Sequence, residues 1–146
     1  MSRRTVGIVG LAVAAIVSLP ALAAAETFDG AYRGTIVCEK LSTSPFMLRA
    51  PFDITVAGKT AIAARPIFNK NGTRVVGSEI ATGTVGDDGK VELVSNWKGG
   101  RSSYQGSYGG MLTGKGGTLT GTQAWTMPEG QRESRSCTLA VIQAKS

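Results

Sequence analysis

Histidine is absent from this chain of 146 residues, and cysteine occurs only twice. Without histidine there can be no Ser-His-Asp triad, no Cys-His pair and no histidine-based zinc site. Cys38 and Cys137 are expected to form a disulfide, which would remove a thiolate nucleophile as well. We therefore expect no catalytic residues, no metal site and no cofactor.

Paired carboxylates could still catalyse glycoside hydrolysis without histidine. The acidic residues away from the expected turns are Asp53, Glu79 and Glu92. Asp53 and Glu92 fall on the outward faces of their expected strands, away from any cavity. Residues 87–89, Asp-Asp-Gly, lack the spaced oxygen ligands of a calcium loop and are typical of a hairpin turn. The sequence thus predicts a protein that is not an enzyme.

Long apolar runs are also missing, except near the amino terminus. Arg3 and Arg4 precede an apolar stretch at residues 6–19, and small residues follow at 23–25. This order is typical of a secretory signal peptide. We expect a signal peptide at residues 1–25, removed near Ala25, and one domain at residues 26–146. The protein is then periplasmic or secreted, in a bacterium.

Charge is modest in this sequence. The formal net charge is +6, and removal of Arg3 and Arg4 with the leader lowers it to +4. A nucleic-acid partner would require Lys and Arg clustered along one stripe, so none is expected.

A helical period is missing from residue 26 onward. Turn signals instead recur every 10 to 17 residues, as in an all-β meander. Several are Asn-Gly, Asp-Gly or Gly-Gly pairs, which supply the positive φ angles of tight hairpins. Seven expected turns join eight strands, and they lie at residues 42–45, 57–59, 69–72, 87–89, 98–100, 115–117 and 128–130.

Most segments between these turns alternate apolar and polar residues, as strands with one buried face do. Two segments alternate poorly: residues 60–68, where Pro66 interrupts the pattern, and residues 74–85. Eight antiparallel strands joined in sequence lose their unpaired edges by closing on themselves. The predicted fold is all-β, a single eight-stranded antiparallel up-and-down β-barrel.

The two cysteines support this closure. In an exported protein an even number of cysteines indicates disulfide pairing. Cys38 lies late in the first strand and Cys137 early in the last, and both fall on inward faces. Because closure makes these strands antiparallel neighbours, we expect the disulfide to join the first strand to the last.

One end of the barrel gathers basic residues, because alternate connections meet at the same end. This mouth is expected to have a basic rim of Lys70, Arg74, Lys98, Arg101 and Arg132. Five inward residues near it are the candidate ligand-binding residues: Trp97, Tyr108, Gln123, Trp125 and Arg135. For the inward residues the alternative is core or barrel-end packing, and for the rim it is charge placed for solubility.

Residues 94–98, Val-Ser-Asn-Trp-Lys, together with residues 104–106 and 124–127, resemble the fifth, sixth and seventh strands of the avidin and streptavidin family. The resemblance implies an eight-stranded, calycin-type barrel that binds a ligand inside. Tyr32 stands where that family has a tryptophan, and its biotin-contacting asparagine and serine have no counterpart. The likeness is therefore one of architecture, which does not determine the ligand.

Two functions follow from these patterns. The first is an exported barrel that binds a small apolar or anionic ligand, or an envelope glycan, at its mouth. The alternative is a filled barrel that acts as a protein-interaction scaffold, such as an inhibitor of a secreted enzyme or an envelope assembly factor. A barrel embedded in a membrane is not expected, because the nine aromatic residues are too few for two aromatic girdles.

Overall fold

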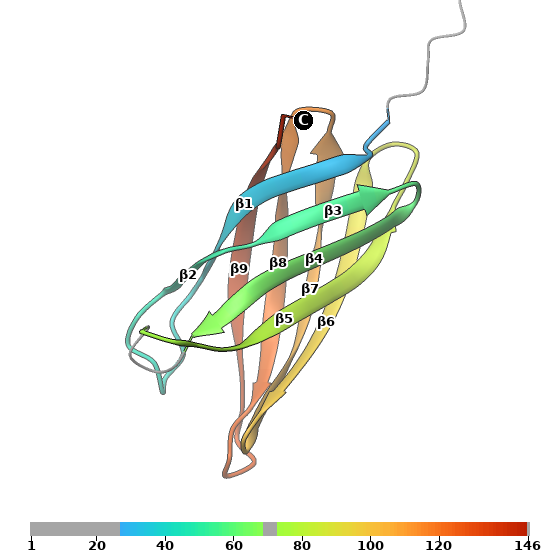
Figure 1. Cartoon of the computed structure of the whole chain (residues 1–146). Coiled ribbons are helices and arrows are strands. Elements are labelled where there is room, and N and C mark those ends of the chain that lie inside the picture. The colour runs from blue at the N-terminus through green and yellow to red at the C-terminus, as the bar shows by residue number, and fades with distance from the viewer. Residues whose placement is uncertain (1–26, 69–72, 146) are drawn as a thin grey trace, which may run out of the picture.

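A computed structural model describes residues 27–68 and 73–145. These residues form antiparallel β-strands joined by short turns (Figure 1). The strands are β1 (Gly30–Cys38), β2 (Leu48–Pro51), β3 (Asp53–Ala57), β4 (Thr60–Phe68), β5 (Val75–Val85), β6 (Lys90–Gly99), β7 (Ser102–Thr113), β8 (Gly116–Thr126) and β9 (Arg132–Gln143). Within the described part of the chain, no helix is long and apolar enough to span a membrane.

The sheet closes into a barrel. Each of the strands from β3 to β8 pairs with the next, β3 also pairs with β1, and β9 returns to pair with β1 from Tyr32↔Gln143 to Cys38↔Cys137. Eight strands therefore surround the interior, and the predicted fold is confirmed.

The additional strand arises from a division of the predicted second strand at Phe52. β2 and β3 lie along β1 in one register, as the pairs Ile36↔Ala50 and Tyr32↔Ile54 show. The Phe52 amide donates to the carbonyl of Gly34 at 3.0 Å across the division. β2 and β3 thus continue each other along the same side of β1.

The predicted disulfide is present. Cys38 and Cys137 lie opposite each other in the pairing of β1 with β9, and both are buried. The bond joins the first strand to the last at the seam where the barrel closes. The two cysteines are 99 positions apart in sequence, so almost the whole barrel lies within the covalent loop.

Apolar side chains fill the interior over much of its length. At the end where the chain enters β1, Phe28 is buried and the Tyr32 hydroxyl donates to the Phe28 carbonyl at 2.8 Å. Phe52 contacts Tyr108 edge to face, with ring centroids 5.5 Å apart. This half of the barrel is packed as a conventional core.

β4 runs through Pro66, which pairs with Ser78 of β5. The expected strand at residues 60–68 is therefore present, and its alternation of buried and exposed residues stops at Pro66, as the sequence pattern indicated. Pairing between β3 and β4 stops at Asp53↔Ala64, so the backbone of Pro66 has no ladder partner on that side and needs no amide hydrogen there.

The mouth end is less completely paired than the opposite end. β5 pairs with β6 from Ala81↔Ser95 to Val85↔Val91, and β5 continues toward the mouth without further pairs to β6. Residues 65–68 of β4 and 75–79 of β5 thus pair with each other but not with β3 or β6, and Figure 1 shows these strand ends lying apart from the ends of β6 to β9.

Candidate functional site

A layer of buried polar side chains lies between the apolar core and the mouth. Five strands each contribute one inward residue, placed there by the two-residue period of a β-strand. Arg65, for example, follows the inward residues Ala61 and Ala63 on β4. The members are Arg65, Glu79, Ser95, Gln123 and Arg135.

An ion pair joins the first two members of this layer. Arg65 and Glu79 lie opposite each other on β4 and β5, and Arg65 Nε donates to Glu79 Oε2. The other carboxylate oxygen, Oε1, accepts from Ser95 Oγ and from the Tyr108 hydroxyl, the latter at 2.8 Å. Both carboxylate oxygens are therefore satisfied, as a buried charge requires.

These contacts keep Glu79 ionised. Burial alone would raise the pKa of Glu79, but the positive charge of Arg65 and the hydrogen bond from Ser95 outweigh burial and hold that pKa below its usual value. Burial raises the pKa of Tyr108 and of Tyr104 well above the ordinary tyrosine value, so both hydroxyls stay protonated and can donate.

Hydrogen bonds continue from the ion pair across the barrel. The Tyr108 hydroxyl accepts from Gln123 Nε2 at 2.9 Å. Gln123 Oε1 accepts from Arg135 Nε at 2.8 Å and from Arg135 Nη2 at 2.6 Å. A continuous network therefore connects the buried carboxylate to a second buried arginine on the far side of the interior.

Arg135 has no carboxylate partner. Its side chain is buried, with the residue 7% exposed, and no described Asp or Glu lies within 4.0 Å of it. Burial, and then the nearby charge of Arg65, lower the pKa of Arg135. A guanidinium has five N–H donors, and the bonds to Gln123 occupy two of them. The layer thus holds two arginines against one carboxylate, an excess of one positive charge.

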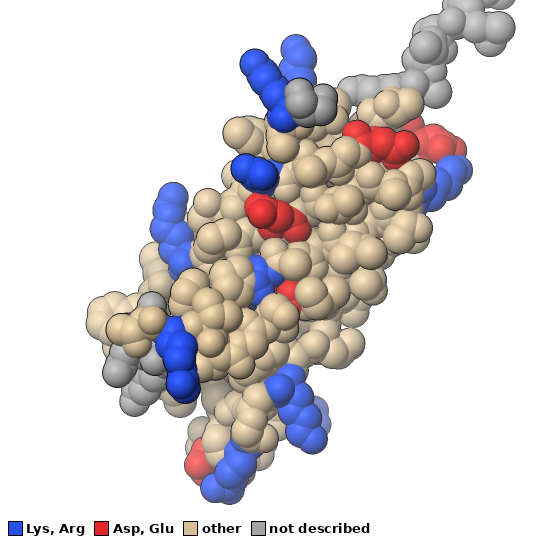
Figure 2. All heavy atoms as spheres, viewed as in Figure 1, with Lys and Arg blue, Asp and Glu red and all other residues tan. Residues whose placement is uncertain are grey.

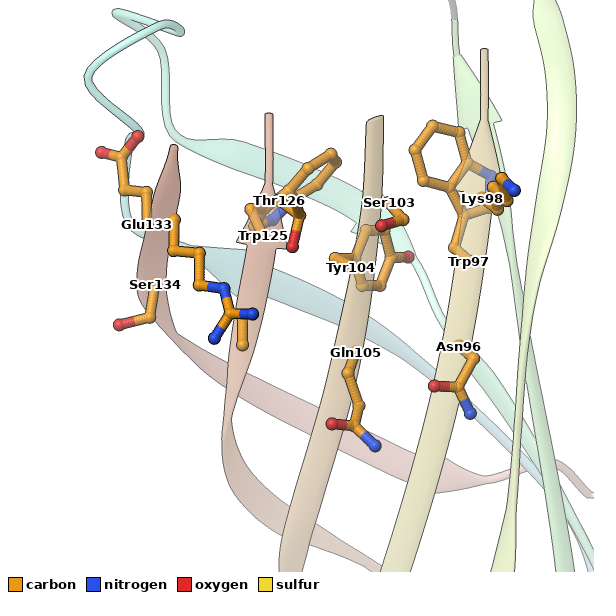
Figure 3. A pocket seen from close by; sticks show the side chains of 12 residues that line it. Asn96, Trp97, Lys98, Ser103, Tyr104, Gln105, Trp125, Thr126, Glu133 and Ser134 are labelled. Atoms are coloured by element: carbon orange, nitrogen blue, oxygen red, sulfur yellow. The ribbon is translucent and has the colours of Figure 1, made fainter. Parts of the chain in front are cut away.

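Three aromatic side chains lie over this layer on the mouth side. Trp97, Tyr104 and Trp125 face one another from β6, β7 and β8 in direct strand register. The ring centroids of Tyr104 and Trp125 are 4.6 Å apart, and those of Trp97 and Tyr104 are 5.6 Å apart. Figure 3 shows these rings at the ends of neighbouring strands.

The aromatic residues also contact both arginines. The Tyr104 hydroxyl accepts from Arg65 Nη2 at 2.8 Å, and the Arg135 guanidinium carbon lies 5.4 Å from the Trp125 ring centroid. The indole Nε1 of Trp125 is buried and has no hydrogen-bond partner among the described residues. An unpaired buried donor next to an unpaired buried cation is suited to an acceptor from outside the chain.

A depression of about 730 Å³ lies across the ends of β6 to β9 (Figure 3). Its lining consists of three rows of residues that run across these strands. The middle row, Trp97, Tyr104, Trp125 and Glu133, faces inward, and the rows on either side of it face outward. Because most of the lining residues face outward, the depression lies on the outer surface of the sheet. The outward lining residues are mostly polar: Asn96, Lys98, Ser103, Gln105, Ala124, Thr126, Arg132 and Ser134.

The structure brings four of the five candidate ligand-binding residues into direct contact: Tyr108, Gln123, Arg135 and Trp125. Trp97 joins them through the aromatic cluster. Of the predicted rim, Arg74, Lys98, Arg101 and Arg132 are exposed at the mouth end, and Lys70 lies outside the described residues.

Sequence reasoning missed four members of this site: Arg65, Glu79, Ser95 and Tyr104. Glu79 was considered as a carboxylate, but its strand alternates poorly and its side was not assigned. Arg65 could have been recognised from the alternation along its own strand: Ala61 and Ala63 are small apolar residues that face inward, and Arg65 follows two residues later on the same face.

Fold and site together define a small antiparallel β-barrel, closed by a disulfide, with a charged polar layer under an aromatic mouth. No protein-family model matches the chain, and no curated protein matches it. Within the described residues, His, Cys, Asp and Glu side chains form no group of three that could hold a metal ion.

Proposed function

We propose that this protein is an exported, non-enzymatic binding protein that takes a small anionic ligand at the mouth of its barrel. One observation carries the proposal: Arg135 is buried in the polar layer without a carboxylate partner. A buried charge is costly unless it is paired, and an anion would supply the missing partner. Arg135 would bind it through the N–H groups that Gln123 does not use.

The surroundings of Arg135 indicate the chemical class of the ligand. Trp125 offers an apolar ring face and an unpaired Nε1 donor, and Trp97 and Tyr104 extend the aromatic surface across the neighbouring strands β6 and β7. A carboxylate on an apolar body fits both features, because its oxygens meet N–H donors while its body packs against rings. We therefore propose small organic acids as the ligand class.

Charge around the mouth supports the same class. Arg74, Lys98, Arg101 and Arg132 are exposed at this end. Basic side chains around a binding site attract anions and raise their rate of association. Arg101 Nη2 also lies 3.4 Å from the Pro128 carbonyl, which links the β6–β7 and β8–β9 turns on this rim.

The resemblance to the avidin and streptavidin family supports a ligand at this end. The three resembling segments lie in β6, β7 and β8, the strands that carry Trp97, Tyr104 and Trp125. Membership of that family would imply a ligand bound inside the barrel. Biotin is not proposed, because the polar residues that contact it have no counterpart here.

A protein-interaction scaffold is the second candidate, and the packed interior favours it. Apolar side chains fill the half of the barrel away from the mouth, so a ligand could occupy only the mouth half. A scaffold would contact a protein partner through its loops and would tolerate changes inside the barrel.

The binding protein and the scaffold differ in the role of Arg135: it contacts the ligand in the first and no ligand in the second. A panel of aromatic and aliphatic carboxylic acids, with phosphate and sulfate, would be titrated while tryptophan fluorescence and thermal unfolding are followed. We expect at least one carboxylic acid to raise the unfolding temperature, and Arg135→Gln to weaken its binding by about tenfold or more. Arg33→Gln, an exposed change on β1, is the matched control and should bind as the unmodified protein does.

A panel without any stabilising acid would contradict the proposal, and so would equal binding by the folded Arg135→Gln variant. Native mass spectrometry of protein purified gently from its own compartment adds an independent reading. A retained small acid would identify the ligand class directly, whereas a retained protein would favour the scaffold.

A further inference from the structure

We propose that the mouth end of the barrel docks on an anionic membrane surface by inserting two apolar tips. The first tip is Phe46 and Met47 in the loop between β1 and β2, and the second is Phe68 and Val75, the last described pair of β4 and β5 on the mouth side. Their exposed fractions are 78%, 61%, 42% and 55%, respectively. The inference is independent of the proposed ligand and uses none of the five candidate ligand-binding residues, although four residues of the proposed basic rim contribute charge to both.

The two tips belong to one surface. β2 begins immediately after Met47 and packs beside β4, and Phe68 pairs with Val75 across the hairpin. Figure 1 shows the β1–β2 loop, the end of β4 and the start of β5 at the same end of the molecule. Large apolar side chains gathered on an exposed surface mark a site of interaction rather than ordinary surface.

Charge at this end identifies the occupant as an anionic surface. Exposed basic residues lie at this end of the barrel: Lys40, Arg49 and Arg74 close in sequence to the two tips, and Lys98, Arg101 and Arg132 at the ends of β6 to β9. Three acidic residues accompany them, and one of these, Glu133, is half-buried and accepts from the backbone amide and hydroxyl of Ser42. Basic residues therefore prevail where the apolar side chains project, and Figure 2 shows Lys and Arg side chains around these strand ends.

The opposite end has a different charge arrangement. There Lys59 is paired with Asp87 and Lys90 with Glu92, and the other exposed charges are of both signs, Asp29 and Asp88 against Arg33, Lys115 and Lys145, so positive charge prevails less at this end than at the mouth. An anionic bilayer would consequently attract the mouth end first. Apolar side chains that enter the headgroup region and basic side chains at its surface are the two components of reversible membrane binding.

Vesicle flotation tests the proposal, with phosphatidylcholine vesicles compared with vesicles that also contain phosphatidylglycerol. The protein used begins at residue 26, because the apolar leader would itself bind lipid and the barrel is complete without it. We expect binding to the vesicles with phosphatidylglycerol, loss of that binding at high salt, and little binding to phosphatidylcholine alone.

The double variant Phe46→Ser/Met47→Ser should bind at least about tenfold more weakly, because two apolar side chains no longer leave water. Ile142→Ser is the matched control: Ile142 is 70% exposed on β9 at the other end of the barrel, and its replacement should change nothing. Phe68→Ser examines the second tip separately. All these positions are exposed, so the variants should keep the barrel, which circular dichroism would verify.

Absence of binding to vesicles with phosphatidylglycerol would overturn the proposal. Binding that the Phe46→Ser/Met47→Ser variant retains in full would also overturn it, as would equal binding to both kinds of vesicle. Arg135→Gln should still bind vesicles, and the double variant should still bind the carboxylic acid. Measuring vesicle binding by Arg135→Gln and acid binding by the double variant therefore tests the docking surface and the ligand site independently of each other.

Discussion

At the residue scale, Glu79 holds the polar layer together. It is fully buried and accepts from Arg65, Ser95 and Tyr108. Without its charge, the layer would contain two buried arginines and no anion. The net charge of the mouth interior therefore depends on this one carboxylate.

Glu79→Gln should destabilise the fold by about 3–5 kcal/mol at neutral pH, because it leaves Arg65 buried without its ionic partner. Urea unfolding of both proteins would measure the difference. The double variant Arg65→Met/Glu79→Leu removes both charges and should recover most of the loss. If Glu79→Gln alone unfolds at the same urea concentration as the unmodified protein, the ion pair contributes nothing.

The stability difference between the unmodified protein and Glu79→Gln should also depend on pH. The pKa of Glu79 is below 4.5 in the folded state, so its ionisation stabilises the fold above about pH 4.5 and ceases to do so as pH falls through the folded value. Glutamine does not titrate, and the other carboxylates are common to both proteins. The stability difference should therefore shrink below about pH 4.5, and a difference independent of pH would contradict this origin.

Which site residues could be recognised from sequence depended on the strand that carries them. Gln123 and Arg135 lie in segments where apolar and polar residues alternate cleanly, so their inward positions were evident. Arg65 and Glu79 lie in strands that place Ile62 and Ile80 outside and charged residues inside, which reverses the hydrophobic pattern. The inward charges are stabilised because Arg65 of β4 and Glu79 of β5 form an ion pair with each other. The residue pattern of one strand does not show which residue of the neighbouring strand it will meet.

At the scale of the strands, close approach of neighbouring backbones restricts which residues fit. A Cβ added at Gly110 of β7 would meet the Thr118 carbonyl oxygen and would lie 2.7 Å from Leu119 Cα, both backbone atoms of β8. A Cβ at Gly109 would lie 3.6 Å from the Val91 carbonyl, an ordinary contact. Adjacent glycines of one strand thus differ sharply in the space available.

Gly110→Ala should cost about 1–3 kcal/mol or more, because β8 must move away from β7 to make room. Gly109→Ala is the control and should change stability by less than about 0.5 kcal/mol. Thermal unfolding of the two variants provides the comparison. Equal losses would mean that backbone freedom, rather than space between the strands, accounts for both.

Strand positions were largely predictable, because turn residues and alternation are local signals. Residues 60–68 form β4 with the predicted bounds, even though Pro66 lies within it. What local signals could not supply was the loss of pairing beyond Ala64, which lets that proline stay in a strand, and the division between β2 and β3 at Phe52. Both depend on how strands meet across the barrel.

At the scale of the whole molecule, the two ends of the barrel differ. One end is closed over an apolar core by Phe28, and the other carries the charged layer, the aromatic cluster and the two apolar tips. Pairing is also complete around the first end and partial around the second. The end away from the mouth thus has the more complete strand pairing and apolar packing, whereas the mouth end carries the polar and the exposed apolar groups.

The disulfide joins β1 to β9 on the side of the mouth, where the pairing of neighbouring strands is partial. In the chain-entropy model a loop of this size stabilises a fold by about 4–5 kcal/mol, out of roughly 5–15 kcal/mol for a whole domain. Reduction, or Cys38→Ala/Cys137→Ala, should accordingly lower the urea midpoint by a large fraction. Binding of a carboxylic acid should weaken too, since Arg135 is two residues from Cys137 on β9. Coincident unfolding curves for oxidised and fully reduced protein would show that strand pairing alone holds the seam.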